Sequence, residues 1–231
     1  MGHPVGLSPR QLRLLGSLTS LGELKGFYLA GGGAVAWHFR HRRSIDLDIF
    51  SVSKKVSLEE AREALERAAG ARTVAESDVA ISLRADDAAI DLVRYGYAPL
   101  EAPLSGPSGF PVAGPLDLGV MKLAAISRRG LRRDFWDLFV VATSGKNTLA
   151  TLLRAYQKRY GSSAADVYHV VRSLTYFDDA EKEDPRLVGL SASAWKRIRE
   201  WFEARALEVS EVGKLLAPTR AGVVPSRRTR K

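Results

Sequence analysis

The sequence contains no cysteine, and histidine occurs only four times among its 231 residues. The absence of cysteine excludes disulfide bonds, catalytic thiols and thiolate zinc sites. The histidines are scattered and lack the spacing of a metal-binding motif; they are His3, His38, His41 and His169. Any bound metal ion must therefore be a hard cation whose protein ligands are carboxylates.

Long hydrophobic runs are absent as well. The longest apolar stretch, Phe27–Trp37, is interrupted by consecutive glycines and is too short to cross a bilayer core of about 30 Å. The first residues, Met1–Pro4, do not show a charged region followed by an apolar stretch, as a secretion signal would. We therefore expect a cytoplasmic protein without a membrane span.

Basic residues outnumber acidic ones, which gives a formal charge of +9 at pH 7 and a pI near 9.9. Such a field attracts polyanions such as RNA, DNA or a nucleoside triphosphate. Hydrophobic residues make up 45% of the chain, enough to bury one substantial core or two small ones. Composition therefore indicates a globular protein with an anionic partner but does not identify that partner.

The first part of the chain mixes helical and strand patterns. Ser8 and Pro9 are a typical N-cap and first helical residue, and Ser57 with Glu60 forms a capping-box pattern. The elements expected here are a helix over 9–21, a strand over 26–30, a helix over 34–39, a strand over 45–52, a helix over 57–69, and two or three strands over 72–95 with a turn at Asp86–Asp87.

Five prolines and three glycines in residues 99–115 predict an extended connection, and we place a domain boundary there. Apolar periodicity predicts a helical domain over residues 116–217. Residues 218–231 carry five cations without apolar periodicity, which predicts a disordered basic tail. The expected fold class is α+β, with a mixed sheet and helices over residues 1–98 followed by the helical domain.

Two acids on the strand over 45–52 are the first candidates for chemistry. Asp46 and Asp48 lie two residues apart, so both side chains project from one face, about 7 Å apart along the strand. Ile45, Leu47 and Ile49 should then face the core. Two carboxylates held this way can share divalent cations, which activate an attacking hydroxyl and stabilise a leaving pyrophosphate.

A third acid, Asp91, lies between Ile90 and Leu92 on another predicted strand and points away from its apolar neighbours. In that position it can bind one metal ion and accept the hydroxyl proton. Upstream, Gly31, Gly32 and Gly33 follow a strand and precede a helix, where backbone N–H groups can hold phosphates. Taken singly, the acids are compatible with a solvent-exposed strand face and the glycines with an ordinary turn; their order along the chain favours triphosphate binding.

Two segments together resemble the nucleotidyltransferase toxins of the AbiEii/AbiGii type, which are relatives of the polymerase β superfamily. They are Leu29–Ala36, with the glycines, and His41–Phe50, with the acids. Further similarity lies in Ala89–Val93, around the third acid, in Met121–Ala125, and in Arg133–Leu138. The resemblance covers about residues 25 to 140, and the remainder is similar only in being helical.

The resemblance implies that Asp46, Asp48 and Asp91 form a catalytic triad that binds Mg²⁺ or Mn²⁺. It also implies that Lys122 contacts the triphosphate and that Asp134 shapes the site. From the residues alone, Lys122 is equally compatible with a solvated helix surface, and Asp134 with Asp137 suggests a local salt-bridge face beside Arg132 and Arg133. Gly33 departs from the resemblance, because many members of the superfamily carry Ser or Thr there to touch a phosphate.

Two basic segments are candidates for RNA or substrate phosphate contact, with surface cations that only balance nearby acids as the alternative interpretation. The candidate residues are Arg42, Arg43, Arg128, Arg129, Arg132 and Arg133. Trp195, Trp201 and Phe202 have near-helical spacing, which is typical of core residues rather than of a base-stacking platform.

The function expected is metal-dependent transfer of a nucleotide from an NTP to an RNA acceptor, with tRNA as the expected RNA. By resemblance, the protein would be the toxin of a toxin–antitoxin pair and would have a cognate antitoxin as partner. Two alternatives stay open: modification of a small hydroxyl compound such as an antibiotic, and an inactive member of the fold that binds RNA or a protein partner.

Overall fold

The structure is a computed structural model that describes residues 6–85, 88–145, 147–184 and 189–215. The turn predicted at Asp86–Asp87 and the basic tail predicted over 218–231 lie outside the described residues. Within them, the helices of the first part are α1 (Pro9–Leu18), α2 (Gly31–Phe39) and α3 (Leu58–Ala69), with a short 3-10 turn, η1 (Gly22–Leu24). The helices of the second part are α4 (Pro115–Arg128), α5 (Arg132–Thr143), α6 (Leu149–Tyr160), α7 (Ala164–Ser173), α8 (Asp178–Lys182) and α10 (Ala192–Leu215).

Local sequence signals account for several helix ends. The Ser8 hydroxyl accepts a hydrogen bond from the Gln11 backbone N–H, and the Gln11 side chain accepts one from Ser8 N, which is a capping box. Ser57 caps α3 by accepting from Glu60 N. Both predicted helix starts are confirmed, while the short helix α8 was not predicted because five residues carry too little periodicity.

The strands of the described residues form one mixed sheet in the order β3-β4-β5-β2-β1-β7-β6. Their bounds are β1 (Phe27–Ala30), β2 (Asp46–Ser51), β3 (Arg72–Ser77), β4 (Ala80–Ala85), β5 (Ala88–Val93), β6 (Leu104–Ser105) and β7 (Pro111–Val112). The central strand β2 is antiparallel to β1 and parallel to β5. The predicted α+β class, with a mixed sheet followed by helices, is confirmed.

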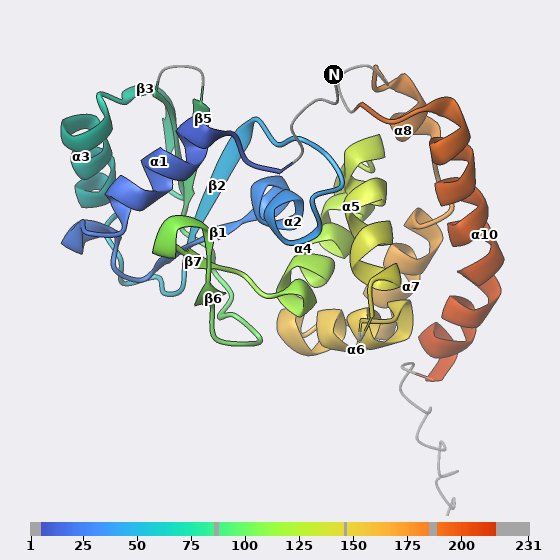
Figure 1. Ribbon diagram of the computed structural model, residues 1–231. Coiled ribbons are helices and arrows are strands. Elements are labelled where there is room, and N and C mark those ends of the chain that lie inside the picture. The colour runs from blue at the N-terminus through green and yellow to red at the C-terminus, as the bar shows by residue number, and fades with distance from the viewer. Residues whose placement is uncertain (1–5, 86–87, 146, 185–188, 216–231) are drawn as a thin grey trace, which may run out of the picture.

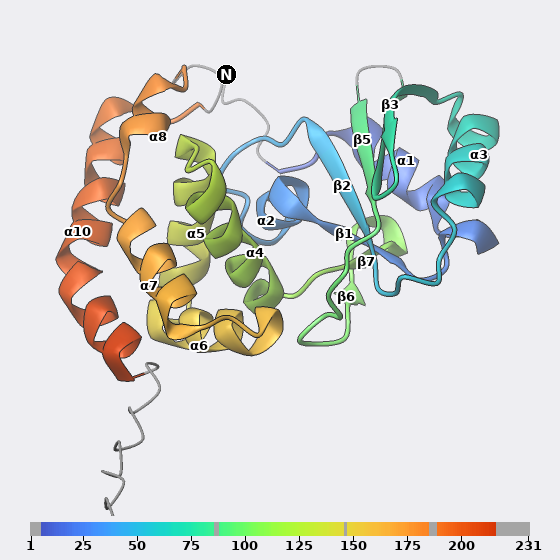
Figure 2. The ribbon, with the colours of Figure 1, turned by 180° about the vertical axis from the view of Figure 1, so that it is seen from behind.

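The sheet separates two sets of helices (Figure 1, Figure 2). Helices α1 and α3 cover one face, where they bury Leu47, Ile49, Ile90 and Leu92 of the central strands. Helix α2 lies on the other side, between the sheet and the helices of the second part. None of the helices in the described residues combines the length and the apolar character needed to cross a bilayer.

Residues 99–115 connect the two parts and also extend the sheet. Leu29 of β1 pairs with Val112 of β7 in parallel, and Ala113 N donates to Leu29 O over 2.9 Å. His38 Nε2 of α2 lies 2.9 Å from the carbonyl oxygen of Ala113, which fixes α2 near the start of α4. The connection is therefore hydrogen-bonded to the sheet, and the division into domains at this segment stays a prediction.

The helices of the second part pack through a cluster of aromatic rings. The ring of Phe135 lies within about 6 Å of the rings of Phe177, Trp195 and Phe202, between α5, α8 and α10. Trp195 and Phe202 are almost fully buried. Trp201, the third residue predicted for the core, is partly buried and packs against it, so the prediction of a core role for Trp195, Trp201 and Phe202 is confirmed.

Candidate active site

The parallel pairing of β2 and β5 brings two of the predicted acids together. In the strand register Asp48 lies directly opposite Asp91, and Asp46 lies opposite Ala89. Along β2, Leu47, Ile49 and Ser51 are buried, whereas the side chains of Asp46 and Asp48 lie on the other face. Asp46, Asp48 and Asp91 therefore share one face of the sheet, and this is the face on which α2 lies.

Ile45 departs from the expected alternation. It was predicted to face the core with Leu47 and Ile49, but 60% of its surface is exposed. The strand begins one residue later, at Asp46, so Ile45 belongs to the preceding loop and has no partner strand to set its direction. The prediction for Ile45 is wrong.

Asp91 has a hydroxyl partner from the next strand. Ser82 of β4 lies opposite Asp91 in the register, and its Oγ donates a hydrogen bond to Asp91 Oδ1 over 2.5 Å. A hydrogen bond of this kind fixes one carboxylate oxygen and leaves the other available. Ser82 was not identified from the sequence, although its place between buried Ile81 and Leu83 shows that it points to the same face as the acids.

The three glycines form the first turn of α2, not a turn before the helix. Gly31 has a φ of +57°, a conformation that glycine adopts without the steric cost of a Cβ atom. An added Cβ on Gly31 would overlap the carboxylate of Asp48. The Gly32 backbone N–H donates to Asp48 Oδ2 over 3.2 Å. The positive end of the helix dipole therefore points at Asp48.

Gly33 packs against the backbone of β2. A Cβ atom at this position would lie 3.0 Å from the carbonyl oxygen of Asp46, closer than most real contacts of this kind. A serine or threonine here would have to shift the strand that carries the acids. The departure of Gly33 from the wider family therefore has a local steric reason in this chain.

Asp48 lies among charges that oppose its ionisation. Burial is the largest cause that raises the pKa of Asp48 to about 6, and the neighbouring carboxylates Asp91 and Asp46 raise it further. The ammonium group of Lys122 and the Gly32 N–H act in the opposite direction without offsetting the rise. Within the described residues, none of the three acids forms an ion pair. The negative charge of the sheet face is therefore not neutralised by a direct ion pair, although Lys122 acts on Asp48 from a distance.

In the described part of the chain, no three His, Asp or Glu side chains are gathered closely enough around one point to hold a metal ion. The three acids nevertheless supply carboxylate oxygens only, which are the ligands that Mg²⁺ and Mn²⁺ prefer. Their mutual repulsion at Asp48 is what a bound cation would relieve. The donor chemistry therefore fits a hard divalent cation.

Beside the acids lies a buried cluster of paired charges, here called the ion cluster: His41, Arg42, Lys122, Asp134 and Asp137. Lys122 Nζ lies 2.9 Å from Asp134 Oδ1 and 2.7 Å from Asp137 Oδ2. Both aspartates are fully buried, and the side chain of Lys122 is 6% exposed. Lys122, predicted to contact a triphosphate, is thus held between two carboxylates on the side of α4 that faces α5.

Asp137 also binds the segment that precedes β2. Arg42 donates from Nε to Asp137 Oδ1 over 2.7 Å and from Nη2 to Asp137 Oδ2 over 2.8 Å, and His41 Nε2 lies 2.7 Å from Oδ1. Arg42 is only 9% exposed, so it departs from the predicted role as a surface contact for RNA. Arg42 Nη2 lies 2.6 Å from the position that a Cβ atom on Gly32 would take, so the arginine fills the space beside this glycine.

The groups of the ion cluster stabilise one another's charged forms. Burial by itself would raise the pKa of Asp137, but Lys122, Arg42 and His41 outweigh it and hold this pKa well below its usual range. Burial would likewise lower the pKa of Lys122, but Asp137 and Asp134 raise it instead. For His41 burial wins, and its pKa is lowered. Arg42, Lys122, Asp134 and Asp137 therefore stay charged across the physiological pH range, whereas burial favours the neutral form of His41.

The predicted basic patch at the end of α4 divides into exposed and buried members. Arg128 and Arg129 are exposed, although Arg129 Nε also donates to Asp134 Oδ2 over 3.0 Å. Arg133 is 42% exposed, with Glu183 at 3.7 Å. Arg132 is buried: it donates to the carbonyl oxygen of Ala180 and stacks on Trp195, so it packs the helices together and is not a surface contact.

Arg43 remains exposed at the start of β2, next to the acids in sequence. Sequence reasoning placed Asp137 in a local salt-bridge face beside Arg132 and Arg133, whereas the structure pairs it with Arg42 and Lys122. A signal for this pairing was present: Asp134 and Asp137 lie three residues apart on a helix among Phe135 and Leu138, and buried acids require buried cations. Lys122 also has apolar neighbours in the sequence, and it is the buried cation that these acids require.

Comparison with known proteins identifies the family. The model of the nucleotidyl transferase AbiEii toxin family, of type IV toxin–antitoxin systems, matches residues 13–103 and 74–204, which together span most of the chain. The chain belongs to this family. An uncharacterized protein of Aquifex aeolicus is 30% identical over 208 residues, which cover 89% of this chain and 98% of that protein.

Solved structures share the fold. MenT4, a nucleotidyltransferase toxin of Mycobacterium tuberculosis, superposes with a TM-score of 0.55 at 18% identity, covering 90% of this chain and 91% of MenT4. ANT(2″)-Ia, solved with adenylyl-2″-tobramycin, has a TM-score of 0.48 at 16% identity, covering 64% of this chain and 98% of its own. The family and the MenT4 fold confirm the predicted nucleotidyltransferase class of this AbiEii member.

Proposed function

We propose that this AbiEii-family protein transfers a nucleotide from an NTP to a hydroxyl group of an RNA acceptor, with tRNA as the expected RNA. It would act in the cytoplasm as the toxin of a toxin–antitoxin pair, with a cognate antitoxin as partner. The reaction centre is the sheet face that carries Asp46, Asp48 and Asp91. The observation that supports it most is the register of β2 and β5, which places Asp48 opposite Asp91 without a cationic partner.

Divalent metal is part of this proposal. Asp46, Asp48 and Asp91 would hold Mg²⁺ or Mn²⁺, because all three offer hard oxygen ligands on one face and repel one another when empty of a cation. When bound, the cation supplies charge stabilisation to the triphosphate and to the attacking oxygen. The neighbouring ion cluster cannot take this role, because its carboxylates are already neutralised by Arg42 and Lys122.

The chemistry proposed is an in-line displacement at the α-phosphorus of the NTP. The acceptor hydroxyl oxygen forms a new bond to that phosphorus, the bond from phosphorus to the oxygen bridging the β-phosphate breaks, and pyrophosphate leaves. Asp91 accepts the hydroxyl proton through the carboxylate oxygen that Ser82 does not occupy. The Gly32 N–H in the first turn of α2 donates a hydrogen bond to Asp48 and so fixes the orientation of this carboxylate.

The triphosphate would lie against the N-terminus of α2, where Gly31, Gly32 and Gly33 leave the backbone without side chains. Lys122 is near enough to Asp48 to lower its pKa, so its charge acts on this part of the site. Asp134 and Asp137 hold Lys122 in place. We therefore assign Lys122 the role of a fixed positive charge beside the triphosphate, with Asp134 and Asp137 as its positioning residues.

The RNA acceptor would meet the exposed cations around this face. Arg43, Arg128 and Arg129 are exposed, and Arg133 is partly exposed, so each can contact phosphate without unfolding a packed helix. The formal charge of +9 supplies the long-range attraction. These contacts position the acceptor, and they carry no preference for a base sequence.

The decisive experiment incubates the protein with total RNA, Mg²⁺ or Mn²⁺, and each of the four NTPs labelled at the α-phosphate. We expect label on an RNA species with at least one NTP, and no label with the Asp48→Asn variant. If label appears instead on a small hydroxyl compound added to the mixture, the acceptor proposed here is wrong. Absence of transfer to any acceptor, with NTP binding retained, would favour the inactive binding module.

A further inference from the structure

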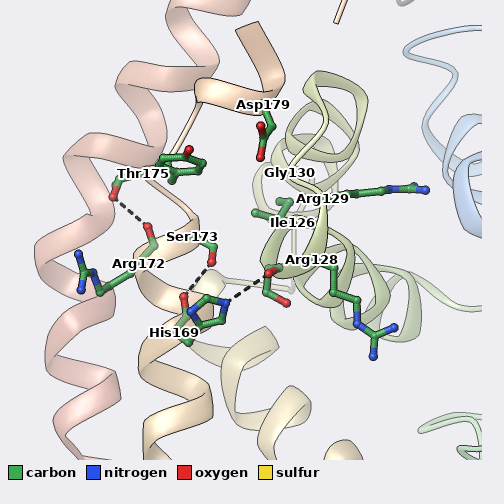
Figure 3. A pocket seen from close by; sticks show the side chains of 11 residues that line it. Ile126, Arg128, Arg129, Gly130, His169, Arg172, Ser173, Thr175 and Asp179 are labelled. Atoms are coloured by element: carbon green, nitrogen blue, oxygen red, sulfur yellow. Dashed lines mark hydrogen bonds between the residues drawn. The ribbon is translucent and has the colours of Figure 1, made fainter. Parts of the chain in front are cut away.

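A cavity lies away from the acids, between the end of α4, the end of α7 and α8 (Figure 3). Its volume is about 510 Å³, within the range of about 300–1,000 Å³ that is usual for sites of small ligands. Ile126 and Gly130 of one wall are apolar, and His169 Nε2 lies 3.3 Å from the carbonyl oxygen of Ser127, which joins α7 to α4.

Cations flank this cavity on opposite sides. Arg128 and Arg129 extend from the end of α4 toward the part of the molecule that holds the sheet, whereas Arg172 extends from α7 on the far side (Figure 3). Within the described residues, neither Arg128 nor Arg172 has an ion-pair partner. An exposed, unpaired guanidinium group binds phosphate oxygens through parallel N–H donors. The side chains of Arg128 and Arg172 both point away from the cavity in Figure 3, and because they are exposed each can turn toward a phosphate at its own rim.

Aromatic and acceptor groups complete the lining. Tyr176 is 54% exposed, although large aromatic side chains are usually covered in a folded protein. Its ring is available to stack on a flat partner. Asp179 also lines the cavity, and Lys182 lies 2.8 Å from its Oδ1, so its charge is balanced and its carboxylate can still accept a hydrogen bond from an N–H group.

The cavity is linked to the reaction centre through Arg129. This residue lines the cavity and also donates to Asp134, whose other partner is Lys122. Arg129 is close enough to Asp48 for that carboxylate to raise its pKa, with the hydrogen bond to Asp134 as the larger cause. A polymer bound at the cavity can thus extend past Arg129 toward the acids.

We propose that this cavity binds one unpaired nucleotide of the RNA acceptor, with its base on Tyr176 and its flanking phosphates on Arg128 and Arg172. Unpaired RNA fits these groups because its bases are free to stack on an aromatic ring while its backbone remains charged. A duplex fits poorly, since its bases are stacked on one another. This assignment rests on the proposed RNA acceptor.

The test measures binding of a fluorescent ten-nucleotide single-stranded RNA to the full chain over a salt series. The variants are Tyr176→Ala, Tyr176→Phe and Arg172→Gln. Tyr168→Ala is the matched control for tyrosine, because Tyr168, on the adjacent helix α7, is equally exposed but does not line the cavity. Arg72→Gln on the edge strand β3 is the control for the loss of one charge. Thermal melting checks that each variant folds.

We expect Tyr176→Ala to weaken binding about tenfold, because one base–aromatic stack is lost, and Tyr176→Phe to restore it. Arg172→Gln should flatten the slope of log affinity against log salt by about 0.7, the value for one phosphate contact on a single strand. Both controls should bind within about twofold of the unsubstituted protein, because single exposed side chains away from the cavity make no positioned contact. In transfer assays, Tyr176→Ala should raise the KM for RNA more than it lowers kcat.

The outcomes separate this proposal from the proposed function. If RNA is labelled but Tyr176→Ala and Arg172→Gln bind it like the controls, the cavity assignment is wrong and the RNA acceptor stands. If a free NTP competes for the cavity as strongly as the oligonucleotide, the cavity is a mononucleotide site and the assignment is again wrong. If the unsubstituted protein neither binds nor labels RNA, the proposed acceptor itself fails.

Discussion

The acids of the sheet face and the ion cluster beside them are built from the same residue types but differ in how their charges are compensated. In the ion cluster, Asp137 is fully buried and has three basic partners within 2.8 Å. On the sheet face, Asp48 accepts one backbone N–H and has two like-charged neighbours, and Lys122 is near enough to lower its pKa without forming an ion pair. A carboxylate whose charge is already neutralised stabilises structure, whereas one that is not is free to bind a cation.

The largest effect should come from removing the unpaired acids. Asp46→Asn and Asp48→Asn should each lower nucleotide transfer by about 10³-fold or more, because each removes a proposed metal ligand. Neither variant opens a core cavity, so its melting temperature should not fall. Asp91→Asn should be equally inactive but should retain NTP binding, since its proposed role is at the attacking hydroxyl.

Single-turnover transfer and NTP binding by calorimetry check these variants, with Glu76→Gln on the exposed strand β3 as the control acid. Full activity of Asp46→Asn or Asp48→Asn would show that the reaction centre lies elsewhere. Normal transfer by Asp91→Asn would mean that another group accepts the proton.

Substitutions in the ion cluster should lower the stability of the fold. Asp137→Asn leaves Arg42 and Lys122 buried with one compensating charge fewer, and removal of one partner of a buried pair typically costs about 3–5 kcal/mol. Asp134→Asn should cost less, because one of its two partners, Arg129, is 55% exposed and can turn to water, and the other, Lys122, keeps Asp137. Urea unfolding measures both. Equal stability of Asp137→Asn and the unsubstituted protein would contradict the structural role of the ion cluster.

Gly31 lies directly beside Asp48 of the sheet face, and a pair of glycines isolates its contribution. Gly31→Ala and Gly70→Ala both place a Cβ on a residue with φ near +60°, but only at Gly31 does that atom meet another group, the Asp48 carboxylate. The shared backbone strain costs about 1–2 kcal/mol in each variant. Gly31→Ala should in addition lower transfer about 10²-fold, because a displacement near 1 Å spoils the reacting geometry.

Transfer rates normalised to the folded fraction check this pair. If Gly70→Ala loses as much transfer as Gly31→Ala, the loss reflects backbone strain and not the position of Asp48.

The smallest effect should be the pH dependence of stability. With its pKa raised from 3.8 to about 6, Asp48 binds a proton more tightly when folded than when unfolded. Its protonation therefore stabilises the fold fully below about pH 4, and this contribution is lost as the pH rises through 6. Because Asp48 is partly exposed, we expect about 1–2 kcal/mol between pH 7 and pH 4.

Urea unfolding of the unsubstituted protein and of Asp48→Asn across this range checks the effect, because other carboxyl groups titrate equally in both. The difference in stability between the two proteins should change with pH in the stated direction. Added Mg²⁺ should oppose the change, since cation and proton compete for Asp48. A pH-independent difference would contradict the raised pKa.

Much of the fold followed from local signals. Ser8 and Ser57 mark helix starts by their capping chemistry, and alternation along β2 showed which face would carry Asp46 and Asp48. Local signals did not reveal β7, because a strand of two residues has no period and is defined by its pairing with β1 and β6. The prediction for Ile45 was wrong for a related reason, because side chains alternate between the two faces only where a partner strand fixes the backbone.

For the site, the sequence by itself determined the acids, the glycines and their order, because strand alternation and the backbone freedom of glycine are properties of a few neighbouring residues. Only the tertiary structure decided which charged side chains neutralise one another. Arg42 and Arg132 look in sequence like the exposed Arg43 and Arg128, yet folding buries them against Asp137 and Trp195. Ion pairing depends on residues some hundred positions apart, and no local pattern encodes that distance.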